Sequence, residues 1–474
     1  MSSSSLPGRP ARAAALLVLA TLLSAPAAWS QTSAFVGVTV IPMDRERVLE
    51  NQTVVVRDGR IASVGPANRA SIPADATRID GRGKFLLPGL AEMHAHVPPQ
   101  QGSEQVIKDI MFLYIANGVT SIRGMLGAPY QLQLRSRLAS GEILGPTLYV
   151  GAPSINGNSA PDPATGARLV REHKQAGYDL LKIHPGPSRA TYDSVAAVAA
   201  QVGISLGGHV PAAVGIDRAL EVRQATIDHL DGYLFGAVDD AMKARIASPT
   251  DTVKPGEIFR AVTQDRMRAL AKRTKDAGVW NVPTMYLWEN FNSPKSAETI
   301  AQNEEMKYTP RQWVNGWVNQ KKNRDNAVVQ AGLSPEDAAL EVKLRRQMLK
   351  LLADEGAPLL MGTDSPQMFN VPGFALHREL QVAVESGLTP FQVLESGSKN
   401  VGRYTREVLK QDGNFGTITE GARADLVLLN ANPLRNLSNL TQRAGVMVRG
   451  KWVSGEEIAA GLAELEARMK TPPQ

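Results

Sequence analysis

His94 and His96 are the residues of this chain whose spacing most clearly suggests chemistry. They follow the apolar run Phe85-Leu86-Leu87, with Pro88-Gly-Leu-Ala-Glu-Met between the run and His94. Side chains two residues apart on an extended chain point to the same face. Two imidazoles that aim at one point predict a metal site.

Four further residues with ligand chemistry lie at the ends of later apolar runs: Lys182, His209, His229 and Asp364. Lys182 and His209 are about one β/α unit apart, as are His209 and His229, and the interval from His96 to Lys182 has room for three units. In a barrel of such units, active-site groups lie at the carboxyl ends of the strands. We therefore expect all six side chains to share one site.

The residue types narrow the choice of metal. Imidazole nitrogens and a carboxylate suit Zn²⁺ better than Ca²⁺ or Mg²⁺, which prefer oxygen ligands. The chain has no cysteine, which excludes disulfides, thiolate ligands and a cysteine nucleophile. A protonated lysine cannot ligate a metal, but a buried lysine has a lowered pKa and can react with carbon dioxide as the free amine. The carbamate formed on Lys182 would be an anionic oxygen bridge between two metals.

The elements that must position these residues predict an α/β fold. Short β-branched runs alternate with helical segments rich in alanine and leucine, which is typical of repeated β/α units. Eight units over residues 85–413 fit a (β/α)8 TIM barrel. The expected strands are 85–93, 118–123, 147–151, 180–183, 204–208, 225–228, 279–283 and 357–361.

The interval 236–355 is too long for two plain β/α units. It contains Trp288, Trp313 and Trp317 together with mixed charge runs. We predict a helical cap inserted into the barrel. Its tryptophans are expected to pack between helices rather than to stack on a substrate.

Strand patterns also occur at both ends of the chain. Two β-branched runs flank Asp58-Gly59, a pair that favours a tight hairpin turn. We predict that residues 32–84 and 414–456 form one small β-sandwich domain, with two unrelated ends as the alternative. Residues 457–474 are expected to form a C-terminal helix or tail.

Residues 1–30 resemble a signal peptide. Arg9 and Arg12 precede an apolar run, and Ala28-Trp29-Ser30 has the form of a signal peptidase site, so cleavage is expected near Ser30 and Gln31. The apolar run is shorter than the roughly 20 residues of a membrane span, which disfavours the alternative of an uncleaved anchor. The protein is therefore expected to be exported, to the periplasm in a Gram-negative host or into the medium in a Gram-positive one.

Composition limits the partners. The hydrophobic content of 43% and charged content of 21% are typical of a folded protein, and a net charge of +6 is mild for 474 residues. No basic run interleaved with aromatic residues is present, which argues against nucleic-acid binding. We expect a small-molecule substrate and no membrane contact after signal cleavage, while the sequence leaves a homo-oligomer open.

The ligand pattern resembles the amidohydrolase superfamily, in the binuclear subtype with H-x-H, a carboxylated lysine, two histidines and an aspartate. All six positions match, and Phe85 to Leu90, Gly416 to Val427 and Asn432-Pro433 are similar to other family segments. Within the superfamily, Gly208 to Pro211 and Leu376 to Leu380 resemble the imidazolonepropionase-like and prolidase-like branches. Many relatives carry Gly-Gly-His after the third strand, whereas this chain has Ser154-Ile-Asn-Gly-Asn158.

The resemblance and the chemistry together imply a role for each ligand. His94, His96 and Asp364 would hold one divalent ion and His209 and His229 the other, with zinc as the expected metal. Carboxylated Lys182 would bridge the two. A hydroxide between the ions would attack an amide carbon, and Asp364 would carry its proton to the leaving nitrogen.

Three more residues follow barrel strands and are candidates for substrate binding. Arg123 has a guanidinium that can fork a carboxylate, although for both Arg123 and Tyr233 structural pairing is an equal alternative. His184 shares a strand face with Lys182, and Tyr233 follows His229.

Three functions remain open. The first is an amidohydrolase acting on dipeptides or N-acyl amino acids, and the second is a lactonase or esterase that uses the same site. The third is a metal-free binding protein on an inactive barrel, which the complete ligand set disfavours. A mononuclear deaminase would resemble relatives with a glutamate soon after His209, where this chain has Val210-Pro211.

Overall fold

The computed structural model describes residues 1, 32–98, 103–248 and 250–470. The predicted signal peptide and its cleavage site lie outside these residues, apart from Met1. The predicted C-terminal helix is present as α17 (Gly455–Lys470), and residues 471–474 lie outside the described part. No helix among the described residues is both long and apolar enough to cross a membrane.

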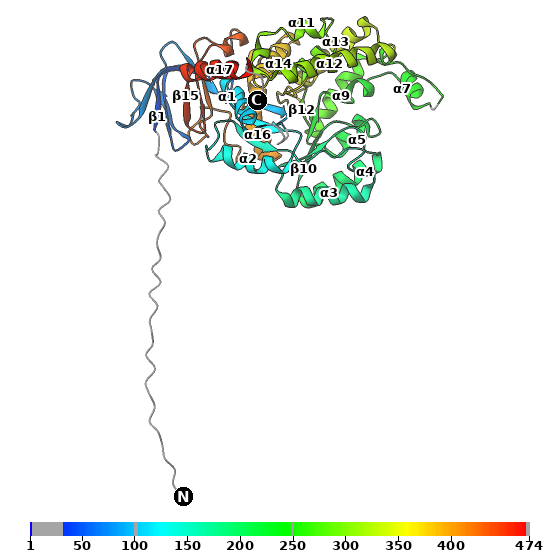
Figure 1. The fold of residues 1–474 in the computed structure, drawn as a ribbon, viewed down its shortest axis with the longest axis horizontal. Helices are drawn as coiled ribbons and strands as arrows, with labels where there is room; N and C mark the ends of the chain where they lie inside the picture. Colours follow the sequence, from blue (N-terminus) through cyan, green and yellow to red (C-terminus); the bar gives the residue numbers. More distant parts are fainter. Residues whose placement is uncertain (2–31, 99–102, 249, 471–474) are drawn as a thin grey trace. The chain divides into compact units, whose positions relative to one another are not determined.

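Strands from both ends of the chain share one eight-stranded sheet. The order is β15-β14-β13-β5-β1-β2-β3, and β4 pairs with β1. Figure 1 shows the blue N-terminal strands beside the red-brown C-terminal ones. The strands are β1 (Ser33–Val40), β2 (Leu49–Arg57), β3 (Arg60–Pro66), β4 (Thr77–Asp80), β5 (Phe85–Pro88), β13 (Leu426–Leu429), β14 (Arg443–Val448) and β15 (Lys451–Ser454). The strands of both ends thus belong to one sheet. The described residues do not show the two separate layers that the predicted sandwich requires.

The hairpin predicted at Asp58-Gly59 is confirmed. It joins β2 to β3, and φ is 52° at Asp58 and 74° at Gly59. Glycine tolerates a positive φ because it has no Cβ, and aspartate is among the few other residues that adopt it. The positive φ angles that Asp58 and Gly59 can adopt therefore allow the tight turn between β2 and β3.

Two parallel sheets contain the predicted strand-end residues. One has the order β6-β7-β8 and the other β12-β11-β10-β9. Their strands are β6 (Leu90–Ala95), β7 (Val119–Gly124), β8 (Thr147–Val150), β9 (Leu180–Ile183), β10 (Ser205–Gly208), β11 (Thr226–Asp228) and β12 (Trp280–Val282). Isolated parallel bridges link Gly151 to Leu180 and Asn281 to Leu359. The fold class is α/β, as predicted.

The first and last of the predicted parallel strands meet along a seam. Ala95 forms a parallel bridge with Ser365. Backbone hydrogen bonds join Met93 to Met361 (2.9 Å), Asp364 to His94 (2.8 Å) and His96 to Ser365 (2.7 Å). This seam, residues 93–96 against residues 361–365, joins segments that are far apart in sequence.

The predicted strand 85–93 is divided at Gly89. Its first part, β5, belongs to the eight-stranded sheet, and its second part, β6, begins the parallel sheet. A Cβ at Gly89 would lie 2.2 Å from Thr120 Oγ1, so only glycine permits this close passage from one sheet to the other. The strand predicted at 357–361 is reduced to the single bridge at Leu359.

Helices follow most of the parallel strands, and well-formed caps set their ends. Asp162 and Ser188 accept hydrogen bonds from the first turns of α3 and α4, and left-handed Gly177 and Gly203 end these helices. Helices of the first half are α1 (Glu104–Ala116), α2 (Pro129–Ala139), α3 (Pro163–Ala176), α4 (Arg189–Val202), α5 (Gly215–Glu221) and α6 (Tyr233–Gly236). Helices after the cap interval are α14 (Phe374–Glu385), α15 (Pro390–Ser396), α16 (Lys399–Glu407) and η2 (Leu437–Thr441).

Among the described residues of the interval predicted as a cap, the regular elements are helices apart from β12. Its elements are α7 (Asp240–Ala247), α8 (Pro255–Arg260), α9 (Gln264–Ala277), α10 (Met285–Phe291), α11 (Ala297–Ile300), η1 (Glu304–Tyr308), α12 (Arg311–Gln330) and α13 (Pro335–Glu355). Trp317 is buried, and its ring lies edge-on to Phe369 at 6.1 Å between centroids. Trp313 also packs against the apolar core. These two tryptophans therefore have the packing role expected for them.

We expect His377, on α14, to make stability depend on pH. Its Nε2 lies 3.1 Å from the Asn117 backbone oxygen and 3.2 Å from an Arg443 nitrogen. Burial, together with the charge of Arg443, lowers the pKa of His377 from 6.5 to about 3. Between these values the unfolded chain binds a proton that the folded chain does not. The free energy of unfolding should therefore fall as the pH drops below 6.5, by at most about 1.4 kcal/mol per pH unit from this group.

Denaturant unfolding at a series of pH values from about 7 down to about 5 checks this expectation. His377→Gln cannot titrate, so its free energy of unfolding should fall less on acidification than that of the unchanged protein. Comparing the two proteins cancels the contributions of the other histidines. Parallel curves for the two proteins would contradict the assignment.

Candidate metal centre

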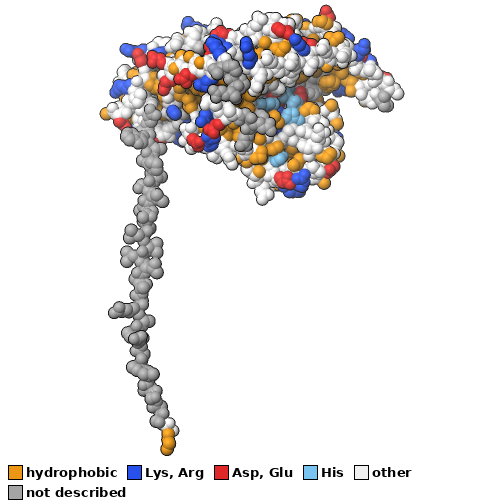
Figure 2. All heavy atoms as spheres, in the orientation of Figure 1, with side chains coloured by type: hydrophobic (Ala, Val, Ile, Leu, Met, Phe, Trp, Pro, Cys, Tyr) orange, Lys and Arg blue, Asp and Glu red, His pale blue; other side chains and the backbone are white. Residues whose placement is uncertain are grey.

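The six predicted ligands lie at the carboxyl ends of the parallel strands. His94 is in β6 and Lys182 is in β9, while His209 and His229 directly follow β10 and β11. Asp364 lies on the other side of the seam from His94, and His96 is just beyond the end of β6. Figure 2 shows histidine side chains in a hollow of the surface.

Three of these residues could hold one ion as they stand. Ligand atoms of His94, His229 and Asp364 all lie within 4.8 Å of one another, and all three residues are buried. Asp364 Oδ1 lies 3.4 Å from His94 Nε2 and 2.9 Å from His96 Nε2. His96 Nε2 therefore lies beside the same carboxylate and offers a fourth ligand atom for the ion.

Lys182 and His209 join the cluster from its other side. Lys182 Nζ lies 3.0 Å from His94 Nε2. The His209 ring lies 4.5 Å from the His229 ring, which is itself 4.5 Å from the His94 ring. The structure thus brings together all six residues named from the sequence.

Unsatisfied polar atoms within this cluster support metal binding. His229 Nε2 is buried and has no hydrogen-bond partner among the described residues, and His96 Nε2 and Asp364 Oδ1 form no hydrogen bond of regular geometry although they lie 2.9 Å apart. Leaving such atoms unpaired in the interior costs free energy, so a group that pairs them would be stabilising. Nitrogen and carboxylate lone pairs that converge are the donor set Zn²⁺ prefers. The residues present therefore fit a divalent metal.

Burial favours the ligand form of these residues. It lowers the pKa of His94 and His229 well below the usual value, with neighbouring cationic groups acting in the same direction. Burial also lowers the pKa of Lys182 from 10.5 to about 8. Neutral imidazole is the form that ligates a metal, and a free amine is the form that reacts with carbon dioxide.

Three side chains that the sequence analysis missed orient the ligand imidazoles. Each lies against an Nδ1 atom, which directs the opposite Nε2 toward the cluster. Hydrogen bonds join Asp231 to His209 (2.7 Å) and Thr284 to His229 (2.8 Å), and Asp228 lies 2.8 Å from His94 without a hydrogen bond of regular geometry. The two aspartates flank His229 in sequence as Asp228-His229-Leu230-Asp231, a signal that was available. Thr284 gave no comparable signal.

Glu92 is another buried acid that was not predicted. It accepts hydrogen bonds from the His94 backbone N–H (2.9 Å) and from the backbone N–H (2.8 Å) and hydroxyl (2.6 Å) of Thr363. Burial raises the pKa of Glu92 to about 8. Because Thr363 precedes Asp364, the hydrogen bonds of Glu92 join the two sides of the seam next to the ligands His94 and Asp364.

Two residues of the interval 236–355 contact the candidate metal centre through the backbone of His229. Arg345 of α13 donates to the His229 carbonyl oxygen at 2.7 Å, and Trp288 Nε1 donates to the same oxygen at 3.1 Å. The Arg345 guanidinium also stacks on the Trp288 ring, 3.3 Å from its centroid. His229 and Leu230 have φ values of 62° and 52°, a strained backbone for residues other than glycine. These two donors hold that strained turn in place.

Arg123 does not have the substrate-binding role predicted as one of its alternatives. Its side chain is fully buried, and it donates to both oxygens of Asp228 at 3.2 Å. Its other donors are taken by the Met93 carbonyl oxygen and by the Thr226 and Tyr404 hydroxyls. A guanidinium with these partners has no free fork for a carboxylate. Arg123 is therefore the structural pair of Asp228.

Tyr233 likewise has structural contacts, which were one of its two predicted alternatives. It is fully buried, and its hydroxyl hydrogen-bonds to Thr274 at 2.9 Å and donates to Asn281 Oδ1 at 2.8 Å. These contacts anchor α6 to α9 and β12 rather than reach a substrate. His184, in contrast, is partly exposed, and its ring lies 5.0 Å from the His209 ring, which agrees with a place beside the metal centre.

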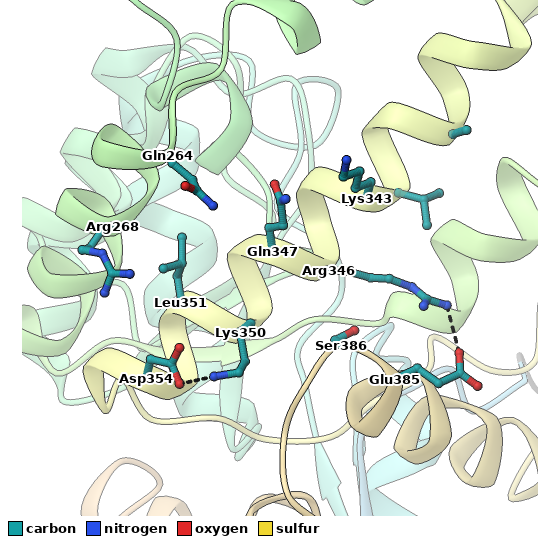
Figure 3. Close-up of a pocket in the computed structure, with 12 residues that line it drawn as sticks. Gln264, Arg268, Lys343, Arg346, Gln347, Lys350, Leu351, Asp354, Glu385 and Ser386 are labelled. Atoms are coloured by element: carbon teal, nitrogen blue, oxygen red, sulfur yellow. Dashed lines mark hydrogen bonds and ion pairs between the residues drawn. The ribbon is translucent and has the colours of Figure 1, made fainter.

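Two surface grooves lie elsewhere. One, of about 670 Å³, lies among α9, α13 and α14 (Figure 3), and the other, of about 500 Å³, shares Ala339, Val342 and Arg346 with it. Neither is lined by any of the six ligands. Charged side chains of the first groove are paired with each other, as Arg346 with Glu385 and Lys350 with Asp354. The convergent chemistry therefore lies at the strand ends and not in these grooves.

Comparison with known proteins identifies the relatives of this chain. A model described as Amidohydrolase family matches residues 85–453. An imidazolonepropionase from Salinispora arenicola is 34% identical over 130 residues, which are 26% of this chain and 33% of that protein. An adenine deaminase from Nitratidesulfovibrio vulgaris is 29% identical over 196 residues, 35% of this chain and 33% of that protein. The chain thus matches about a third of the length of these curated relatives.

Solved structures resemble the whole fold. Bottromycin amidohydrolase has a TM-score of 0.68 at 22% identity, covering 93% of this chain and 91% of that one. A Xaa-Pro dipeptidase with bound methionine in its active site has a TM-score of 0.63 at 18% identity, covering 90% of this chain and 100% of that one. At this level of identity the likeness concerns the fold alone.

Proposed function

This chain belongs to the amidohydrolase family, and we propose that it is a metal-dependent hydrolase that cuts an amide bond in a small substrate. The observation that carries the proposal is that ligand atoms of His94, His229 and Asp364 lie within 4.8 Å of one another in a buried cluster, where His229 Nε2 has no hydrogen-bond partner among the described residues. An inactive binding barrel has no need of such a ligand set. Lactone or ester hydrolysis at the same site is the alternative activity.

The proposed architecture is a closed (β/α)8 barrel joined to a small β domain. Support for closure comes from the parallel bridges that link the two parallel sheets and from the seam between residues 93–96 and 361–365. The β domain would comprise the predicted residues 32–84 and 414–456 together with β5 (Phe85–Pro88), which pairs with β13. The barrel would then span the rest of the predicted range up to residue 413, beginning at Gly89, with a helical cap at about 236–355.

The proposed centre holds two divalent ions, with zinc favoured by the donor set. His94, His96 and Asp364 would hold one, and His209 and His229 the other, with carboxylated Lys182 between them. Bound ions of this kind lower the pKa of water and polarise a carbonyl oxygen, which is the chemistry that amide hydrolysis requires. Two divalent ions and carbon dioxide are the only cofactors in this scheme.

Asp364 would then accept the proton of the attacking water and pass it on. Asp364 Oδ1 lies among the imidazoles, 2.9 Å from His96 Nε2, but forms no hydrogen bond of regular geometry, so it can accept a proton from the attacking water. The same carboxyl group can return the proton to the leaving nitrogen, which departs as an amine. The strained turn at His229 and the oriented imidazoles keep the surrounding groups fixed while this transfer occurs.

We favour dipeptides and N-acyl amino acids as substrates. Support comes from the fold likeness to a Xaa-Pro dipeptidase and from the sequence resemblance to the prolidase-like branch. The partial match to an imidazolonepropionase leaves cyclic amides within the same reaction class.

Metal analysis coupled to a substrate screen tests the proposal. The purified protein should contain about two equivalents of transition metal, lose hydrolysis on dialysis against a chelator, and regain it with Zn²⁺ and bicarbonate. A library of dipeptides and N-acyl amino acids, with matched esters, should then separate amide from ester hydrolysis. Well under one equivalent of metal, with no activity gained on reconstitution, would overturn the proposal.

A further inference from the structure

His184 lies beside the proposed ligands but is not one of them. Its ring is 5.0 Å from the His209 ring, and the His209 ring is 4.5 Å from the His229 ring. The His184 ring is therefore the neighbour of one ligand imidazole, which is itself the neighbour of another. His184 is partly exposed, as expected for a residue that lines the hollow.

The loop after β8 fixes the position of the His184 ring. The Ser154 hydroxyl lies 2.6 Å from His184 Nδ1. Backbone hydrogen bonds hold this loop to β9, because Ile155 N–H donates to the Lys182 carbonyl oxygen and His184 N–H donates to the Ile155 carbonyl oxygen, both at 2.9 Å. Ser154 and His184 are thus placed by adjacent, paired backbones.

Asn156 determines which way the Ser154 proton points. The Asn156 Oδ1 atom accepts from the backbone N–H groups of Asn158 (2.9 Å) and Ser159 (3.0 Å), which fixes the orientation of the amide. Its Nδ2 therefore donates to Ser154 Oγ at 3.1 Å. The remaining partner of the Ser154 hydroxyl among the described residues is His184 Nδ1, which then accepts the hydroxyl proton. The ring hydrogen of a neutral His184 consequently resides on Nε2.

We propose that His184, aligned by Ser154 and Asn156, is a specificity-determining residue that donates a hydrogen bond from Nε2 to the carboxylate of the substrate. This inference rests on the proposed function and names the group that the site recognises. In a dipeptide or N-acyl amino acid, the carboxyl carbon follows the scissile carbonyl carbon by about one residue length, roughly 3.8 Å. The His184 ring lies 5.0 Å from the ring of His209, a proposed ligand, which is a separation of that order.

Arg123, the other residue considered for binding the substrate carboxylate, is excluded by its own contacts. Arg123 is buried and fully engaged by Asp228 and its other partners, so it cannot meet a carboxylate. Carbonyl polarisation belongs to the ligand cluster rather than to His184. The donor at His184 is therefore left for an oxygen that lies away from the reacting carbon.

Steady-state kinetics with a matched substrate pair test the role of His184. The pair is the best N-acyl amino acid or dipeptide of the screen and its C-terminal amide, measured with the metal-loaded protein. His184→Leu should raise KM for the acid by about tenfold to a hundredfold with little change in kcat, because a hydrogen bond to a charged group is lost. Hydrolysis of the amide should change little, so the preference for the acid falls by the same factor.

Two further variants separate donation from packing. His184→Gln keeps an N–H donor on a side chain of similar reach and should retain most of the preference, whereas Ser154→Ala should lose part of it. Metal content should stay unchanged in all three variants. Equal losses for acid and amide, or loss of metal in His184→Leu, would overturn the specificity role while hydrolysis by the unchanged protein still supports the proposed function.

Histidine NMR provides a test that does not depend on turnover. In ¹⁵N-histidine-labelled protein, the signal that disappears in His184→Gln should show the tautomer with hydrogen on Nε2, and Ser154→Ala should give a mixture. Adding N-acetylglycine should shift this signal, and N-acetylglycinamide should not. Hydrogen on Nδ1, or equal shifts with both compounds, would contradict the proposal even if no hydrolysed substrate is found.

Discussion

Replacing Lys182 with alanine is expected to abolish hydrolysis and to reduce the metal content to one equivalent or less. Lys182 is fully buried, and its Nζ lies 3.0 Å from His94 Nε2 within the ligand cluster. Alanine removes the amine that would be carboxylated, so no anionic oxygen remains to hold two cations at close range. Metal analysis and kcat measurement with the best substrate check the result.

Short carboxylic acids should partly restore activity in Lys182→Ala. Formate, acetate or propionate can enter the space left by the side chain and supply the missing oxygens. The recovery should saturate with acid concentration and should be accompanied by recovery of metal content. Rescue by a carboxylate distinguishes a bridging role from a purely structural one, because a packing defect would not respond to added anions in this way.

Lys321 provides the matched control. It is also almost fully buried, but it lies in α12 and pairs with Asp325 at 2.6 Å, away from the cluster. Lys321→Ala should reduce stability without changing the metal content, and acetate should not affect it. Full activity in Lys182→Ala, or metal loss of equal size in both variants, would exclude the bridging role.

Arg123→Met is expected to lower the free energy of unfolding by about 3–5 kcal/mol, because it leaves the Asp228 carboxylate buried and uncompensated. Although burial alone would raise it, the charges of Arg123 and Lys182 hold the pKa of Asp228 below its usual value. Asp228 lies 2.8 Å from His94 Nδ1. Loss of its partner should therefore also weaken metal binding, by about tenfold to a hundredfold.

Denaturant unfolding and competition with a metal chelator measure these two effects. Arg189→Met is the control, since Arg189 forms a partly exposed pair with Asp193 and should cost less than about 1 kcal/mol. The double variant Arg123→Met, Asp228→Asn removes both charges and should recover part of the lost stability. If Arg123→Met instead kept its stability and only raised KM for carboxylate substrates, the residue would contact substrate after all.

The ligand positions could be predicted because each depends on local sequence. A short apolar run predicts a parallel strand, and a histidine, lysine or aspartate at its end then lies on the face where strands of this class carry their functional groups. His94, Lys182 and His209 needed no knowledge of their neighbours. The Asp58-Gly59 turn was predictable for the same reason, since two adjacent residues carry the whole signal.

The roles of Arg123 and Tyr233 depend on partners that are distant in sequence. Arg123 is held by Asp228 and Tyr404, and Tyr233 by Thr274 and Asn281. No local pattern reveals whether a polar residue after a strand points into the hollow or into the interior. The division of residues 85–93 between two sheets could not be predicted from the sequence for the same reason, because Thr120 approaches Gly89 only in the folded chain.

The seam between residues 93–96 and 361–365 also bears on the order in which this molecule is assembled. Its two sides carry His94, His96 and Asp364, and nearly all of the intervening chain must be in place before they meet. Contacts between such distant segments form late because the intervening loop has to close first. An ion held by residues on both sides of the seam could therefore bind only after the two segments have met. It would therefore prolong the lifetime of the native state by slowing its opening, and would do little to speed folding.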